Sequence, residues 1–488
     1  MRNQALGWVL AGCILGVQAA EPLPLSVQVA LRQAQLPPTA LGVVVQALDE
    51  SKPRLAWQAE LPLNPASLTK LVTSMAALDT LGPTWQWQTP VWLTDDGGLA
   101  IQGSGDPRLG VERLWMGLKR LGITELRGPL RLDRSAFTPG TAEPGDFDNE
   151  PWRVGNAQPE ALLLNTKAVA YTFRVDGLQA RVTADPPLDA PTVVPATPGA
   201  CGDWRGALKL QWTSGQRPRF AGSFPAACGE QTWALADPDP ASYPARLLAL
   251  MLREAGIAWR ADAVVEVPAP SGAPTLLWPG PTLGEALRDM NKASSNLMAQ
   301  QVLLSTARAA GVPAPTPDTA ATWLQVWLDT HAGTQPATRV VNGSGLARET
   351  RISPAQLATL LHWAWVQPWM PEFLASLPVA GLDGTLSRQP GRFGAAAGRA
   401  HMKTGSLRDV VALAGIVDAP SGKRWVLVAI LNHPQAQAGR GVLDALLRWV
   451  AQDAPGAKGG GDEAPAGAKA SPGRPALKHA APGSGSDR

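Results

Sequence analysis

The sequence has few residues that could hold a metal ion. Its 488 residues include 3 cysteines and 5 histidines, and the histidines are scattered without an HExxH pair. No Cys/His cluster has the spacing of a zinc site. We therefore expect neither a metal ion nor any other cofactor.

The sequence also lacks a large excess of charge of either sign. The 43 basic and 40 acidic residues leave a formal net charge of +3, and no basic run with interleaved aromatic residues occurs. Domains that bind nucleic acid usually carry such a basic surface, so nucleic acid is not an expected partner. A Gly-x-Ser-x-Gly elbow is absent too, which argues against a Ser-His-Asp hydrolase.

The N-terminus has the pattern of a secretory signal peptide. Arg2 precedes an apolar run at residues 5–17, and small residues follow at 19–20. The run is too short for a comfortable membrane span. We expect cleavage near residue 20, and any membrane contact of the mature chain to be peripheral. Lipoprotein processing at Cys13 is the alternative.

Cleavage would leave two cysteines, Cys201 and Cys228. An even pair in an exported protein predicts a disulfide, which would contribute about 3 kcal/mol on the chain-entropy model. Two unpaired buried thiols are the alternative.

The length exceeds what one hydrophobic core usually serves, so two or three domains are expected. Apolar runs at 41–48 and 54–61 predict one strand hairpin, and those at 410–417 and 425–431 predict another. Residues 268–281 read as a Pro/Gly/Ser-rich linker, and 283–310 as one long helix. The segment 453–488 is rich in Gly, Ala, Pro, Lys and Ser without periodicity, which predicts a disordered tail.

One helix start carries a candidate nucleophile. The stretch Asn64-Pro-Ala-Ser67-Leu-Thr-Lys70 offers a capping Asn and a first-turn Pro, and apolar residues then recur at helical spacing. Ser67 and Lys70 lie three apart and share one helix face. A hydroxyl beside an amine can become a nucleophile. The alternative is an ordinary capped core helix with a surface lysine.

Two further motifs follow in the chain. Ser294-Ser-Asn296 lies within the predicted long helix, and Lys403-Thr404-Gly405-Ser406 opens a predicted strand. Each is weak alone. In this order, Ser-x-x-Lys, Ser-x-Asn and Lys-Thr-Gly form the motif set of penicillin-binding proteins and β-lactamases.

With Asn342-Gly-Ser-Gly-Leu346 and residues 377–385, the chain resembles the class C penicillin-binding proteins. These are bacterial D-alanyl-D-alanine carboxypeptidases and endopeptidases with a large insertion in a transpeptidase-like domain. The resemblance covers residues 41–450. It implies an α+β fold, in which helices flank the antiparallel sheet of a β-lactamase/transpeptidase-like catalytic domain.

The domain boundaries that we expect follow from this resemblance. The catalytic domain would comprise 21–92 and 280–452, after a signal peptide at 1–20. An inserted domain would comprise 93–165 and 236–279. A second inserted β-rich domain, at 166–235, would hold the disulfide.

The resemblance also implies catalytic roles. Ser67 would be the nucleophile, and Lys70 its base if burial and the nearby cation Lys403 suppress the charge of Lys70. Ser294 would relay a proton to the leaving amine. The oxyanion would lie between the backbone N–H groups of Ser67 and Ser406.

Substrate-binding roles follow in the same way. Lys403 and Thr404 would bind the terminal carboxylate of a D-alanine, and Gly405 would let the substrate backbone approach the strand. Asn296 would hold Lys70 and the substrate amide. Asp148, in a segment similar to the family's aromatic-Asp-Asp-x-Pro-aromatic pattern, would receive the amino group of a diaminopimelate side chain. A solvated loop acid is the alternative for Asp148.

The chain departs from the family pattern at three positions. Ser295 and Asn342 stand where the family usually has Asp, and Ser406 stands where it usually has Thr. None of these changes removes a group with a direct role.

The expected function is that of a serine-type D-alanyl-D-alanine carboxypeptidase or endopeptidase of the periplasm. Its partners would be peptidoglycan stem peptides ending in D-Ala-D-Ala, with β-lactam antibiotics as covalent inhibitors. One alternative is a β-lactamase-like hydrolase, although β-lactamases are far shorter. The other is a non-catalytic penicillin- and wall-binding protein.

Overall fold

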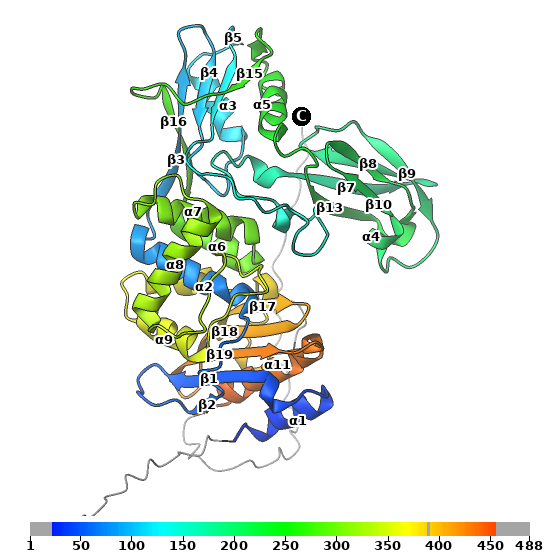
Figure 1. The fold of residues 1–488 in the computed structure, drawn as a ribbon. Coiled ribbons are helices and arrows are strands. Elements are labelled where there is room, and N and C mark those ends of the chain that lie inside the picture. Colours follow the sequence, from blue (N-terminus) through cyan, green and yellow to red (C-terminus); the bar gives the residue numbers. More distant parts are fainter. Residues whose placement is uncertain (1–21, 388–390, 455–488) are drawn as a thin grey trace, which may run out of the picture. The chain divides into compact units, whose positions relative to one another are not determined.

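A computed structural model describes residues 22–387 and 391–454. The predicted signal peptide, the alternative at Cys13 and nearly all of the predicted tail lie outside these residues. No helix within them combines the length and the apolar character that a membrane crossing requires. The described elements form a mixed α+β fold (Figure 1), as predicted.

A five-stranded antiparallel sheet joins the two ends of the described chain. Its order is β17-β18-β19-β1-β2. The predicted N-terminal and C-terminal hairpins are confirmed, although β2 is shorter than expected. The bounds are β1 (Leu41–Ala47), β2 (Leu55–Trp57), β17 (Ala400–Leu407), β18 (Val410–Asp418) and β19 (Arg424–Asn432).

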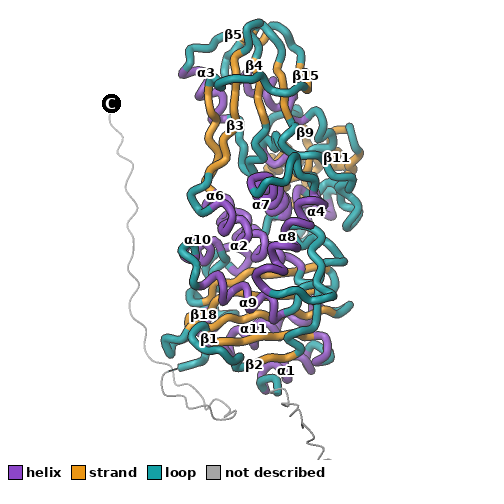
Figure 2. Tube along the Cα trace, turned by 60° about the vertical axis from the view of Figure 1, so that its left-hand side comes forward, coloured by secondary structure: helices purple, strands orange, loops and turns teal. Residues whose placement is uncertain are grey.

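Helices cover both faces of this sheet, because its strands are apolar on both sides. Val44 and Val428 face a core shared with α2 (Thr69–Leu81), α7 (Asn296–Ala309) and α9 (Pro354–Trp365). The alternate strand residues pack on the other face against α1 (Leu25–Gln33) and α11 (Arg440–Ala451). Figure 2 shows the strands of this sheet lying between helices.

A second five-stranded sheet has the order β15-β6-β4-β3-β16. Here the prediction of a linker at 268–281 is wrong in part, because β16 pairs with β3 from Leu276 onward. β16 contains Pro279 and Pro281 but lies at the sheet edge, where proline is tolerated. The bounds are β3 (Gln86–Leu93), β4 (Leu99–Gln102), β6 (Leu130–Asp133), β15 (Val264–Glu266) and β16 (Leu276–Thr282).

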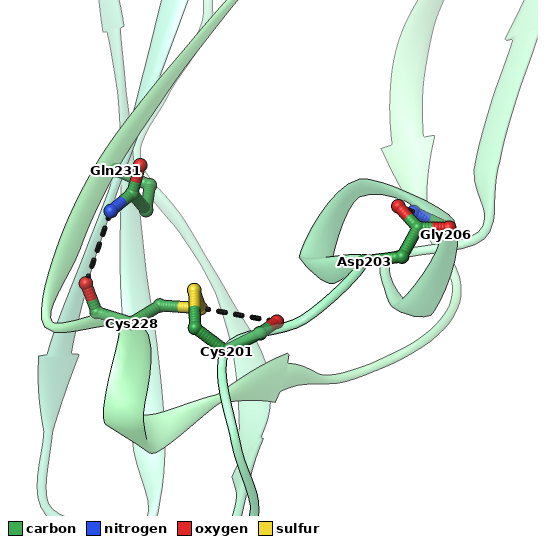
Figure 3. The surroundings of a disulfide bond; sticks show 5 residues. All are labelled: Cys201, Asp203, Gly206, Cys228 and Gln231. Carbon is green, nitrogen blue, oxygen red and sulfur yellow. Dashed lines mark hydrogen bonds between the residues drawn. A yellow bond between two sulfur atoms is a disulfide. The ribbon is translucent and has the colours of Figure 1, made fainter. Parts of the chain in front are cut away.

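A third five-stranded sheet, ordered β12-β9-β8-β7-β13, lies within the predicted β-rich segment. The predicted disulfide is confirmed: Cys201 and Cys228 are bonded, with their Cα atoms 4.7 Å apart (Figure 3). Gln231 donates to the carbonyl of Cys228 beside it. The bounds are β7 (Ala168–Asp176), β8 (Gln179–Asp185), β9 (Thr192–Thr197), β12 (Phe224–Pro225) and β13 (Glu230–Ala236).

The prediction of one continuous helix at 283–310 is wrong, because the helix is interrupted. The structure has two helices, α6 (Leu283–Ala293) and α7, separated at Ser294 and Ser295. Ser294 adopts a left-handed backbone with φ 56°, and Ser295 is extended and caps α7 through a bond from the Met298 N–H. The break therefore places the Ser-x-Asn motif at a helix junction.

The remaining helices and strands are α3 (Glu112–Arg120), α4 (Trp204–Ala207), α5 (Tyr243–Glu254), α8 (Pro317–Ala332), α10 (Met370–Ser376), β5 (Glu125–Leu126), β10 (Leu210–Thr213), β11 (Gln216–Phe220) and β14 (Ala258–Trp259). Of these, α8 joins the core of the first sheet, and α3 and α5 pack in the core of the second sheet. The division into one catalytic and two inserted domains at the stated boundaries stays a prediction.

Candidate active site

Ser67 lies in the short 3-10 helix η2 (Ala66–Leu68), directly before α2. Asn64 shapes this entry, since its Oδ1 accepts the Ala66 N–H at 2.8 Å. Ala66 itself has φ +47°, an uncommon conformation for a residue with a side chain. Ser67 is half-buried and Lys70 follows one helical turn later, so the predicted Ser–Lys face exists.

Lys70 is fully buried, and three oxygen atoms surround its amine. Nζ lies 2.9 Å from Ser67 Oγ, 2.8 Å from Asn296 Oδ1 and 2.6 Å from the carbonyl oxygen of Ser344. Burial lowers the pKa of Lys70 well below its ordinary value, and the charge of Lys403 lowers that pKa further. Both causes were predicted from the sequence.

The Ser344 carbonyl belongs to the loop 342–346, which packs against the segment that carries Ser67. Asn342 Oδ1 accepts from the N–H groups of Ser344 and Gly345, at 3.0 and 2.9 Å, and from the Ser344 hydroxyl. Gly345 has φ 76°, and a Cβ there would lie 1.9 Å from the carbonyl oxygen of Ala66. Glycine is therefore required where this loop crosses the segment that carries Ser67.

Lys403 joins the third motif to the second. It is fully buried on β17, and its Nζ donates to Ser294 Oγ and to the Thr404 carbonyl, both at 2.8 Å. Burial lowers the pKa of Lys403 to about 7. The helix break at Ser294 turns its hydroxyl toward this lysine. The structure thus has two hydrogen-bonded groups, Ser67 with Lys70 and Asn296, and Ser294 with Lys403, and the charge of Lys403 acts on Lys70.

The β17 edge presents the remaining motif residues. Thr404 Oγ1 lies 2.8 Å from Thr385 Oγ1, in the segment 377–385 that the sequence singled out. A Cβ at Gly405 would lie 2.6 Å from the Pro65 carbonyl oxygen. Gly405 therefore also lets the strand approach the Ser67 segment, a reason that the sequence did not reveal. Ser406 is exposed at the end of the strand.

A cavity of about 820 Å³ lies beside these groups and includes Asn296 and Ser406 in its lining. Asp148 also lines it, so the structure brings this predicted residue to the site. Asp148 Oδ1 accepts from the Glu150 N–H at 2.9 Å and from Asn156 Nδ2 at 2.8 Å. Its Oδ2 lies 3.9 Å from Arg153 Nε.

Two of the departures from the family pattern have structural roles. Ser295 caps α7, and Asn342 organises the loop that supplies the carbonyl partner of Lys70. Sequence reasoning noted both residues without finding these roles. It missed Gln437 and Arg440, which bond to Ser406 from outside any motif.

In the described stretches, no three His, Cys, Asp or Glu side chains gather as a metal site would require.

Comparison with known protein families gives one match over nearly all of the described chain. Residues 23–453 match the family model described as the D-Ala-D-Ala carboxypeptidase 3 (S13) family. A carboxypeptidase from Mycolicibacterium smegmatis is 27% identical over 417 residues, covering 80% of this chain and 76% of that protein. A D-alanyl-D-alanine carboxypeptidase from an Actinomadura species is 29% identical, covering 83% and 79%.

Solved structures share the fold. Penicillin-binding protein 4 from Haemophilus influenzae superposes with a TM-score of 0.71 at 21% identity, covering 86% of this chain and 99% of that one. The same protein in complex with a β-lactam gives a TM-score of 0.64 at 20% identity. At such identities the likeness concerns the fold.

Proposed function

The chain belongs to the D-Ala-D-Ala carboxypeptidase 3 (S13) family, and on this premise we propose that it cleaves peptidoglycan stem peptides through an acyl-enzyme on Ser67. The observation that carries the proposal is the contact of Ser67 Oγ with the buried amine of Lys70, at 2.9 Å. A serine hydroxyl is a weak nucleophile without a base within hydrogen-bond reach. Lys70 is that base.

In the acylation step, Ser67 Oγ attacks the carbonyl carbon of the penultimate D-alanine while its proton passes to Lys70 Nζ. The C–N bond to the terminal D-alanine then breaks. Its amine must leave with a proton, which Lys70 supplies through Ser294. The Ser294 hydroxyl already accepts a bond from Lys403, so its own hydrogen is free to donate.

Water then hydrolyses the ester on Ser67 and restores the free enzyme, with Lys70 as the base once more. A cross-linked peptide offers the same D-alanine carbonyl with a different amine as the leaving group. One acyl-enzyme therefore serves both carboxypeptidase and endopeptidase action. Penicillins would acylate the same serine, which makes them covalent inhibitors.

The substrate would lie along the β17 edge. Lys403 and Thr404 form the predicted carboxylate subsite, and the cavity that Ser406 lines has room for the stem peptide. Asp148 lines that cavity and would receive the amino group of a diaminopimelate side chain. A wall substrate of this kind, together with the predicted signal peptide, supports action in the periplasm.

Neither alternative function gains support from a specific observation. The non-catalytic alternative rests on Ser295 and Asn342, and both have structural roles that leave the Ser67–Lys70 contact intact. The site needs no cofactor for acyl transfer in this mechanism.

The test is product analysis on purified muropeptides, with pentapeptide monomer and cross-linked dimer supplied together. We expect free D-alanine and tetrapeptide from the monomer, and none from Ser67→Ala. Rapid turnover of penicillin without release of D-alanine would favour the β-lactamase alternative. Acylation by penicillin without any peptide product would favour the non-catalytic one.

A further inference from the structure

Two side chains from beyond the sheet bond to the hydroxyl of Ser406. Gln437 lies in the 3-10 helix η8 (Ala436–Gly439), and its Nε2 is 3.4 Å from Ser406 Oγ. Arg440 is the first residue of α11, and its Nη2 is 3.1 Å from the same oxygen. Both partners are donors, so Ser406 Oγ accepts from each.

This pattern determines what Ser406 can offer to a ligand. A serine hydroxyl has two lone pairs and one hydrogen. Arg440 provides the closer of the two contacts, because Gln437 Nε2 shares its two hydrogens among Ser406 Oγ and the carbonyls of Leu407 and Val410. Since both neighbours are donors, the hydrogen of the Ser406 hydroxyl is left to donate. Ser406 lines the cavity beside the Ser67 segment, so its hydroxyl can donate a hydrogen bond to an acceptor of a ligand in that cavity.

The position of Arg440 is itself controlled. Gln437 Oε1 accepts from Arg440 Nη2 at 2.7 Å. Nε2 of the same glutamine donates to the carbonyls of Leu407 and Val410, which bound the turn between β17 and β18. Gln437 therefore ties the guanidinium to the strand end that carries Ser406.

The charge of Arg440 has no counterpart in the described protein. Among the residues that the structure describes, no acidic side chain forms an ion pair with Arg440. A cation in the first turn of a helix also opposes the helix dipole, which favours acidic residues there. The first turn of α11 has none. An exposed, unpaired cation in an unfavourable helix position suggests that an external anion is its partner.

The motif lysine cannot fill this role alone. Lys403 is fully buried, and its amine already donates to Ser294 Oγ and the Thr404 carbonyl, so at most one hydrogen is left for a substrate carboxylate. With a pKa lowered to about 7 by burial, it carries only part of a charge at neutral pH. A second cation beside Ser406 would therefore strengthen the binding of a substrate carboxylate at the β17 edge.

We propose that Arg440, held by Gln437, is a positioning residue of the carboxylate subsite: it fixes the Ser406 hydroxyl as a donor to the terminal carboxylate of the substrate and supplies a positive charge beside it. The inference rests on the proposed function and adds a residue that lies outside all three motifs. It concerns recognition of the carboxylate, whereas Ser67 and Lys70 perform the acyl transfer.

The test compares two substrates on the full chain, an acyl-D-Ala-D-Ala peptide and its C-terminal amide. Acyl-enzyme formation followed by mass spectrometry gives a rate even where turnover of the amide is slow. In Arg440→Ala, we expect the preference for the carboxylate to fall by about tenfold, the size of a weak charge-assisted hydrogen bond. Arg440→Lys should restore part of the preference, since it returns the charge without the fork of donors.

Arg408→Ala is the matched control. Arg408 lines the cavity that Ser406 and Gln437 also line, but no bond joins Arg408 to Ser406 in the described structure. Its removal should reduce the preference far less than removal of Arg440. If Arg440→Ala folds poorly, Gln437→Ala replaces it, and the same direction of change is expected.

An unchanged preference in Arg440→Ala would overturn the inference, and so would an equal loss on both substrates, which would indicate a structural role. The proposed function fails separately. It fails if the wild-type chain forms no acyl-enzyme at Ser67 with either substrate or with penicillin.

Discussion

The amine of Lys70 lies 2.9 Å from the hydroxyl oxygen of Ser67, and its two other partners are both acceptors. A neutral amine has two hydrogens and one lone pair. Asn296 Oδ1 and the Ser344 carbonyl take the hydrogens, so the lone pair is left to face Ser67. The geometry therefore fits a lysine that acts as a base, in agreement with a pKa that burial lowers well below its ordinary value.

The rate of acylation should depend on pH through Lys70. It falls toward acid pH, because protonated Lys70 cannot accept the Ser67 proton. In Lys403→Gln the charge that helps to lower the pKa of Lys70 is lost, while burial, the larger cause, remains. We expect the acid limb of the pH profile to move upward, but not to the ordinary lysine value of about 10.4. A limb that stays in place or moves downward would contradict this account.

Asn342 should be replaceable by aspartate and not by alanine. Its Oδ1 accepts three bonds within the loop 342–346, and its Nδ2 donates one to the Leu346 carbonyl at 3.1 Å. Asn342→Asp keeps the acceptor and should acylate at close to the wild-type rate. Asn342→Ala should lose about 1–3 kcal/mol of stability and acylate at least about tenfold more slowly, because the Ser344 carbonyl shifts away from Lys70. Stopped-flow acylation and chemical unfolding would check this, and equal rates for the two variants would refute it.

Gly345→Ala should damage both stability and activity. The new Cβ would lie 1.9 Å from the Ala66 carbonyl oxygen, and φ is 76°. We expect a loss of about 3 kcal/mol or more in the free energy of unfolding. Gly122 is the control, because it has a similar φ of 72° with no atom within 4 Å of an added Cβ. Gly122→Ala should cost about 1 kcal/mol and leave acylation unchanged. Equal costs at the two positions would contradict the packing argument.

Asp106 should make the protein less stable as pH rises. It is 1% exposed, and burial raises its pKa from 3.8 to about 6. Between these values the folded state holds more protons than the unfolded state, so the free energy of unfolding falls as pH rises through that window. Asp106→Asn keeps an acceptor for the Arg108 N–H and removes the buried charge. We expect the variant to gain about 3 kcal/mol relative to wild type between pH 4 and 7. A constant difference across this range, measured by urea unfolding, would contradict it.

The sequence predicted the elements with strong periodicity and the residues that carry motifs. The strands β18 and β19 and the helix after Ser67 follow from apolar patterns. The pairing of Cys201 with Cys228 was predicted from the signal-peptide pattern and the even number of cysteines. These predictions rest on the sequence pattern of each segment, and they hold where that pattern agrees with the packing of the core.

What the sequence could not predict depends on tertiary contacts. The break between α6 and α7 has no glycine or proline to mark it, since Ser294 itself adopts the left-handed conformation. β16 was read as a linker because Pro279, Gly280 and Pro281 mask a strand at a sheet edge. The bond from Arg440 to Ser406 joins α11 to β17, and Arg440 belongs to no motif that would predict it.

The central claim is that Ser67 is the nucleophile, and covalent labelling with a fluorescent penicillin tests it most directly. The account predicts one label per wild-type chain, located on Ser67 by mass spectrometry of the digested protein, and no label on Ser67→Ala. Lys70→Ala should keep the serine but label far more slowly, because the base is missing. An unlabelled wild-type chain, or an undiminished label on Ser67→Ala, would contradict the account.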